Sequence, residues 1–294
     1  MTLEVITLKT YIIMEQKLIS TQWSTKSPGH LIILDDQSRT MGEKYFGNKN
    51  RAECAAEAIN LCFNDLILAN QNGEYVYPRS FNQIIGYGGE GGDSVKKLLE
   101  GTLPELANKP LRMEKVKQNM ADGARGMAEL VKEIAIFIDP VWKGCTVMGE
   151  AFKMAYDEIL KRGADHVILI NISDGGPWSY EREFKEVEYA KEQARRIMNL
   201  NIPDGHPKIL NAHIGSGQPQ YICPGPETRL IGRQANFLWE ISSELTDADR
   251  AVARKFGMNL PAHARGFVSN ADALTLLRFI QFGSSAGKPD RVAA

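Results

Sequence analysis

Short apolar segments alternate along this chain with longer segments whose apolar residues repeat at helical spacing. The segments HLIILDD at 30–36 and HVILINIS at 166–173 are typical of strands that are buried on both sides. The stretch at 50–73 has one apolar helical face and stops at the turn sequence NQNG. Strands and helices in this order form a mostly parallel sheet that helices cover. We therefore expect a doubly wound α/β fold with a mostly parallel central sheet and helices on both faces.

The other elements are predicted from the same patterns. Further strands are expected at 81–89 and 208–215, and further helices at 147–162, 180–199 and 229–245. In the first helix, the apolar residues at helical spacing are Ala55, Ile59, Cys62 and Leu66. The same spacing of Met127, Leu130, Ile134 and Phe137 predicts a further helix over 123–138.

The chain divides into three parts. Its 294 residues are enough for one large domain or two small ones. Residues 1–29 are a lead-in, for which an added strand and a disordered stretch both remain open. Residues 30–245 form the domain itself. Residues 246–294 contain two helical patterns and are expected to pack on the domain as a helical extension, because their apolar positions cannot be buried alone.

Composition excludes several classes of function. Lys and Arg total 35 and Asp and Glu total 36, so the net charge of −1 provides no basic surface for nucleic acid or for a membrane. Apolar runs such as VILI at 167–170 are too short to span a bilayer, and Glu4 and Lys9 interrupt any signal peptide. No pair of cysteines has CxxC spacing, which favours reduced thiols and a cytoplasmic location; the cysteines are Cys54, Cys62, Cys145 and Cys223.

Oxygen-bearing side chains follow the predicted strands. Asp36, Ser38 and Thr40 come directly after the first strand, and Asp174 follows HVILINIS before two glycines. Thr146 stands at the glycine-led start of a predicted helix. In an open α/β sheet the ends of the strands share one edge, and oxygen ligands suit a hard cation such as Mg²⁺. Each element alone has a simpler explanation, namely an acidic turn, a helix N-cap at Thr146, and a turn at Asp174.

Together these residues resemble the metal-ion-dependent adhesion site of von Willebrand factor type A domains. That site comprises a DxSxS loop, a Thr from a second loop and an Asp from a third. Here the intervals are 110 residues (146 − 36) and 28 residues (174 − 146), and Thr40 stands where the family usually has Ser. The resemblance covers about residues 30–245, and FLWEISSEL and RGFVSNADALTLLRFI are similar to the C-terminal part of bacterial intracellular members.

The resemblance implies a Rossmann-like fold and a site for Mg²⁺, with Mn²⁺ or Ca²⁺ as alternatives. Ser38 and Thr40 would bind the metal directly, and Thr146 directly or through water. Asp36 and Asp174 would act largely through coordinated water, and the family spacing selects Asp36 over Asp35. One coordination position would stay open for an Asp or Glu of a partner.

The implied function is a protein-binding module without catalytic activity, a scaffold or regulator in a bacterial stress or conflict system. The expected partner is another protein, such as a kinase, a phosphatase or an ATPase, and neither a nucleic acid nor a membrane. Four residues beside the metal edge are candidates for contact with that partner: Gly88, Gly89, Trp178 and Tyr180.

Two other functions remain as alternatives. The sequence GYGGEG at 86–91 matches a dinucleotide fingerprint, although that fingerprint needs a long helix directly after it. A Mg²⁺-dependent phosphotransferase could use Asp36 or Asp35 as its nucleophile. Such enzymes usually have a second acid two residues after the nucleophile, and Gln37 and Ser38 occupy those places.

Overall fold

A seven-stranded sheet runs through the centre of the described chain, in the order β12-β13-β11-β10-β1-β6-β7. The computed structural model describes residues 23–92, 94–121, 127–183, 185–215, 220–255, 257–271 and 273–285. The strands are β1 (Gly29–Asp36), β6 (Ser80–Tyr87), β7 (Val95–Thr102), β10 (His166–Ser173), β11 (Lys208–His213), β12 (Tyr221–Ile222) and β13 (Phe267–Ser269).

The middle of the sheet is parallel and its two edges are antiparallel. β1 pairs in parallel with both β6 and β10, β10 pairs in parallel with β11, and β11 with β13. The edge strands β7 and β12 run antiparallel to their neighbours. The mostly parallel sheet predicted from the sequence is therefore confirmed, and the carboxyl ends of β1, β10 and β11 lie side by side.

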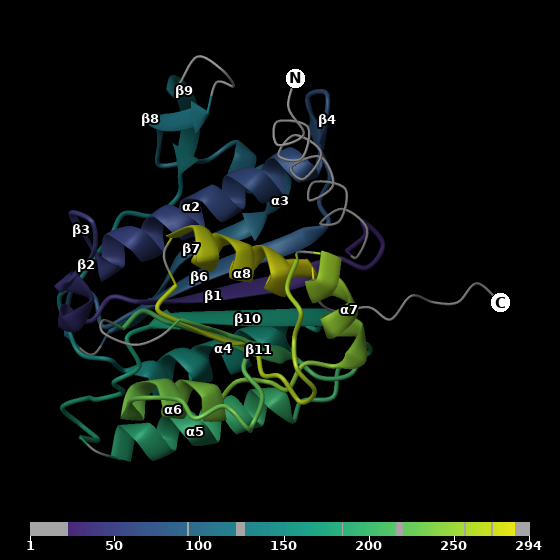
Figure 1. Cartoon of the computed structure of the whole chain (residues 1–294). Coiled ribbons are helices and arrows are strands. Elements are labelled where there is room, and N and C mark those ends of the chain that lie inside the picture. Colours follow the sequence, from purple (N-terminus) through teal and green to yellow (C-terminus); the bar gives the residue numbers. More distant parts are fainter. Residues whose placement is uncertain are drawn as a thin grey trace.

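Helices cover both faces of the sheet (Figure 1). In β1, Leu31 and Ile33 face one core, and Ile32 and Leu34 face the other, as the alternation of side chains along a strand requires. The first core is covered by α2 (Arg51–Ala69), α3 (Leu103–Ala107), α7 (Asp247–Lys255) and α8 (Ala273–Ser285), and the second by α4 (Met148–Arg162), α5 (Lys185–Met198) and α6 (Arg233–Glu240).

Local sequence explains where α2 begins and where α4 ends. Asn50 caps α2 in a capping box: its side chain accepts from the backbone N–H of Glu53, whose carboxylate accepts from the N–H of Asn50. α4 ends at Gly163, which adopts the left-handed conformation that glycine tolerates without a steric penalty. The remaining short elements are η1 (Arg39–Gly42), β2 (Lys44–Phe46), β3 (Lys49–Asn50), β4 (Gln71–Asn72) and β5 (Tyr75–Val76).

The helix predicted over 123–138 is wrong. Met127–Ile136 forms strand β9, which pairs antiparallel with β8 (Arg112–Ala121) in a hairpin that projects from the body (Figure 1). The base of this hairpin is bonded to α2: the Asn64 side chain bonds the backbone of Ala135, and the Asn60 side chain bonds that of Ile138. Pairing with β8 satisfies the backbone of β9 in an extended conformation, and together with the bonds to α2 it overrides the helical spacing of the apolar residues.

The segment after residue 246 is more than a helical extension. It contains α7 and α8, and it also supplies β13, which lies between β11 and β12 in the central sheet. α8 packs beside α2, where Gln281 donates a hydrogen bond to Asp65 at 3.0 Å. The C-terminal segment therefore completes both the sheet and one of its cores. Most of the predicted lead-in, residues 1–22, lies outside the described residues.

The described residues contain neither a helix that could span a membrane nor a disulfide bond. Among the described residues, no helix combines the length and the apolar character needed to cross a bilayer. No disulfide joins the four cysteines, all of which lie in the described part of the chain.

Candidate metal centre

Three loops bring the predicted ligands together at the carboxyl edge of the sheet. Ser38, Thr40, Thr146 and Asp174 all line one cavity of about 690 Å³. Ser38 and Thr40 follow β1, Thr146 precedes α4, and Asp174 follows β10. The oxygens of Ser38 and Thr40 lie 3.2 Å apart, so the two hydroxyls converge. Asp36 is fully buried beneath them and does not line the cavity.

The carboxylate of Asp36 is held on both sides. Its Oδ1 accepts from the backbone N–H of Ser38 at 2.9 Å, and its Oδ2 accepts from the hydroxyl of Ser173 at 2.5 Å. Burial, followed by the nearby negative charge of Asp174, raises the pKa of Asp36 to about 7 despite these bonds. A divalent cation above this carboxylate would favour its charged form and lower that pKa.

Asp35 lies on the other side of the strand end. It is also buried, and Gln37 donates a hydrogen bond to it at 3.2 Å. Burial raises the pKa of Asp35 to about 7 as well. Neither Asp35 nor Asp36 lines the cavity, and only Asp36 bonds to the backbone of Ser38, so the choice of Asp36 over Asp35 stays a prediction.

Backbone hydrogen bonds join the loops of the site. The N–H of Arg39 donates to the carbonyl of Gly144 at 2.9 Å, and the N–H of Gly144 donates to the carbonyl of Gly88 at 2.6 Å. The N–H of Lys143 donates to the carbonyl of Gln37 at 2.8 Å. The second loop is therefore bonded on one side to the first loop and on the other to the loop after β6.

Gly88 and Gly89 are buried and do not line the cavity, so neither is exposed for direct contact with a partner. Gly88 has φ +74°, and a Cβ atom there would lie 1.9 Å from the carbonyl oxygen of Cys145. A Cβ at Gly89 would lie 2.5 Å from Oε1 of Gln37. The structure thus explains Gly88 by the close approach of the Cys145 backbone and Gly89 by that of the Gln37 side chain.

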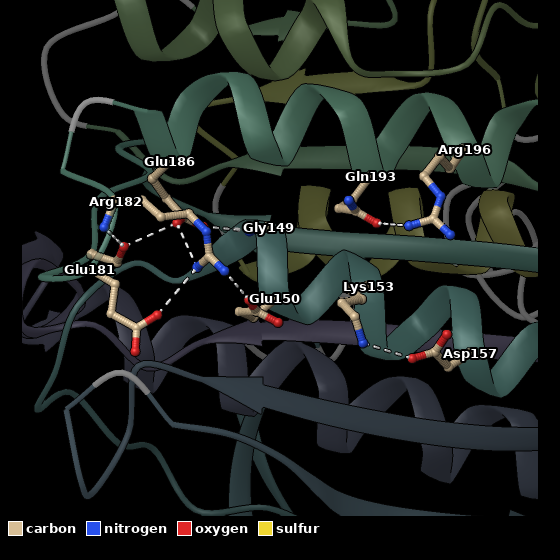
Figure 2. A network of polar contacts seen from close by, with 10 residues as sticks. Gly149, Glu150, Lys153, Asp157, Glu181, Arg182, Glu186, Gln193 and Arg196 are labelled. Atoms are coloured by element: carbon tan, nitrogen blue, oxygen red, sulfur yellow. Dashed lines mark hydrogen bonds and ion pairs between the residues drawn. The ribbon is translucent and has the colours of Figure 1, made fainter.

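Thr146 is not the N-cap of α4. The cap is Val147, which provides no side-chain hydrogen bond, so an N–H in the first turn needs another acceptor. Glu186 of α5 supplies it: its Oε1 accepts from the N–H of Gly149 at 2.9 Å (Figure 2). The start of α4, and with it Thr146, is therefore held by a carboxylate from a neighbouring helix.

The same carboxylate holds the segment that follows Asp174. Oε2 of Glu186 accepts from the hydroxyl of Ser179 at 3.1 Å, and Arg182 lies 3.6 Å from it. Arg182 also donates to Glu150 of α4 at 2.5 Å (Figure 2). Glu186 is fully buried, and this burial raises its pKa. This cluster joins the second loop to the segment 177–182.

Trp178 and Tyr180 line the cavity beside Thr146. The N–H of Trp178 donates to the carbonyl of Thr146 at 3.0 Å. The two rings meet edge to face with centroids 4.8 Å apart, and Trp178 is 36% and Tyr180 73% exposed. Their apolar surface lies at the rim of the site, where a partner could contact it.

Asp174 has two neighbours that the sequence did not predict. Arg51 donates to its Oδ2 at 3.0 Å from the first turn of α2. His213, at the end of β11, also lines the cavity, and burial lowers its pKa to about 4, so its ring is neutral at pH 7. Ser173 was missed as well. No local sequence pattern marks Arg51, His213 or Ser173 as part of the site, because each reaches it from a different helix or strand.

The donor set suits a hard cation. The hydroxyls of Ser38, Thr40 and Thr146 and the carboxylate of Asp174 line the cavity, Glu43 adds a second, exposed carboxylate, and Asp36 is buried next to Ser38. The described residues hold no cluster of three or more His, Cys, Asp or Glu side chains that could bind a metal. A metal here would therefore rely on Ser and Thr oxygens and on water, and few negative charges would neutralise it.

Comparison with known proteins supports the fold. No protein-family model matches the chain, and no curated protein sequence matches it. A solved structure of the pilus adhesin SpaC from Lactobacillus rhamnosus GG is similar over 86% of this chain and 30% of that one, with 10% identity and a TM-score of 0.50. Manganese-loaded TRAP from Plasmodium vivax is similar over 89% of this chain and 75% of that one, with 12% identity and a TM-score of 0.45.

The conserved hypothetical protein BatB from Bacteroides thetaiotaomicron is similar over 78% of this chain and 97% of that one, with 15% identity and a TM-score of 0.38. At 10% identity the likeness to the SpaC structure concerns the fold alone. The mostly parallel sheet and its two helical layers form the doubly wound, Rossmann-like α/β fold of von Willebrand factor type A domains, which is the fold that the sequence predicted.

Gly88→Ala should disturb the site far more than Gly92→Ala. Both glycines have positive φ, so each alanine costs about 1–2 kcal/mol in backbone strain. Only the Cβ at Gly88 meets backbone, whereas the space around Gly92 is open. Chemical denaturation should show the larger loss of unfolding free energy for Gly88→Ala. Equal losses in the two variants would contradict the supporting role of Gly88.

Asp36→Asn should gain stability relative to the wild type as the pH rises from 4 to 7 in the metal-free protein. The folded-state pKa of Asp36 is about 7 and its ordinary value is 3.8, so between these values the folded state binds more protons than the unfolded state. Stability then falls as pH rises, by about 1.4 kcal/mol per pH unit for one such group. Thermal unfolding in chelator should show the variant gaining on the wild type from pH 4 to pH 7. A constant difference would refute the raised pKa.

Proposed function

We propose that this chain is a metal-dependent protein-binding module. Mg²⁺ would be held by Ser38, Thr40 and Thr146, with Asp36 and Asp174 acting mainly through its water molecules. When bound, the ion supplies a Lewis-acidic position that accepts an acidic side chain of a partner protein. The observation that supports this proposal best is the convergence of three hydroxyls and one carboxylate, from three separate loops, on one cavity above a buried aspartate.

The geometry favours binding over catalysis. A phosphotransferase needs an aspartate that can reach its substrate, but Asp35 and Asp36 are buried and do not line the cavity. The GYGGEG segment leads into strand β7 and not into a helix, so the helix N-terminus that binds a pyrophosphate is missing there. We therefore propose that the chain has no catalytic activity of its own.

The finer points of the function are part of the same proposal. The partner is a protein that offers a carboxylate, and Trp178 and Tyr180 form the rim that contacts it. A kinase, a phosphatase or an ATPase of a bacterial stress or conflict system is the expected kind of partner, and the cytoplasm is the expected location. Mn²⁺ or Ca²⁺ could replace Mg²⁺, because all three prefer oxygen ligands.

Loss of a hydroxyl ligand should weaken metal binding. We expect Ser38→Ala and Thr146→Ala each to reduce the affinity for Mg²⁺ at least roughly tenfold, the lower end of what loss of an indirect partner costs at metal sites. Thr228→Ala, outside the cavity, is the control and should bind as the wild type does. Calorimetric titration of the full chain measures all four proteins. Wild-type affinity in both site variants would rule out these ligands.

Partner capture should depend on the metal. The full chain should retain a protein partner in Mg²⁺ and release it in chelator, because the proposed contact runs through the ion. Trp178→Ala should weaken capture without changing Mg²⁺ affinity, since the ring lies at the rim and is not a ligand. The measurement is a pull-down in parallel with the titration. Capture that persists in chelator would contradict a metal-mediated contact.

A further inference from the structure

Arg51 places a positive charge inside the candidate metal centre. It is the first residue of α2, and its side chain is only 8% exposed. Its Nη1 donates to Oδ2 of Asp174 at 3.0 Å and to the carbonyl of Thr40 at 3.0 Å. One guanidinium nitrogen thus bonds both the first loop and the third loop of the site.

The pair between Arg51 and Asp174 is poorly screened by solvent. The side chain of Asp174 is 11% exposed and that of Arg51 is 8% exposed, so little water lies between the two charges. Arg51 has a second acidic neighbour, Glu43 at 3.0 Å, but the side chain of Glu43 is 60% exposed and its charge is screened by water. The strongest charge interaction of Arg51 is therefore with Asp174.

The position of Arg51 matters because the metal needs the same carboxylate. Any cation bound among Ser38, Thr40 and Thr146 lies in the cavity that Arg51 also lines. The ion and the guanidinium repel each other, and both are attracted to Asp174. A fixed positive charge at this place must reduce the attraction of the site for a divalent ion.

We propose that Arg51 is a permanent counter-cation of the site, which stabilises Asp174 when no metal is bound and lowers the affinity for a divalent ion. This inference rests on the proposed function. Because Asp174 is shared, the bound ion keeps more of its own positive charge. That charge is then available to an anionic partner, so Arg51 favours joint binding of metal and carboxylate over binding of metal alone.

The first test is Mg²⁺ titration of the full chain with Arg51→Gln and Arg51→Lys. Arg51→Gln removes the charge and should tighten Mg²⁺ binding by about tenfold or more, given the strength of a charge pair at this distance. Arg51→Lys keeps the charge and should bind as the wild type does. Arg39→Gln, an exposed arginine of the same cavity, is the control and should change the affinity much less. Unchanged or weaker binding by Arg51→Gln would overturn the inference.

The second test needs no metal. In chelator, Arg51→Gln should lower the thermal stability, because Asp174 then lacks its counter-charge. In the Asp174→Asn background the same change should cost much less, which a double-mutant cycle measures. Equal costs in the two backgrounds would overturn the inference.

The two tests separate the inference from the proposed function. If neither the wild type nor Arg51→Gln bound Mg²⁺, the proposed function would be overturned. The cycle would still decide whether Arg51 is the counter-cation of Asp174. If the wild type bound Mg²⁺ and the cycle showed no coupling, the metal site would stand and only the role of Arg51 would fall.

Discussion

The buried carboxylate of Asp36 joins the two central strands at the edge where the site lies. It ends β1, accepts from Ser173 at the end of β10, and turns the following loop by accepting from the N–H of Ser38. Placing a carboxylate with no exposure in this position is costly, and its raised pKa expresses that cost. The hydrogen bonds offset part of it, and a cation above the carboxylate would offset more.

The parts of the fold that could be predicted are those with a clear pattern in the local sequence. Unbroken apolar runs marked β1 and β10, and one apolar face with its stop signal marked α2. β9 was mispredicted because its apolar residues fit a helical spacing, whereas its backbone pairs with β8 along its whole length and the base of the hairpin is bonded to Asn60 and Asn64 of α2. A contact across the chain leaves no trace in a local pattern. The strand β13 was not predicted because its three residues are too few to show the alternation of apolar and polar residues that marks a strand.

The candidate site divides in the same way. Its proposed ligands follow strands or precede a helix, so their order in the chain was enough to place them on one edge of the sheet. Arg51, Ser173 and Glu186 were not predicted, because what each does depends on which neighbour its side chain reaches. The predicted residues supply the donor atoms and the negative charges of the site, whereas Arg51 adds a positive charge and Ser173 and Glu186 hold its loops in place.

Glu186 helps to fix the shape of the candidate site. Helix α4 has no cap of its own, and its first turn depends on a carboxylate that also bonds Ser179. A shift of the segment that carries Trp178 and Tyr180 therefore disturbs the acceptor for the helix that follows Thr146. Thr146 is further tied to Trp178 by a backbone hydrogen bond. The aromatic rim and the proposed ligand Thr146 are thus linked twice, directly by the backbone bond and indirectly through the carboxylate that Ser179 and the first turn of α4 share.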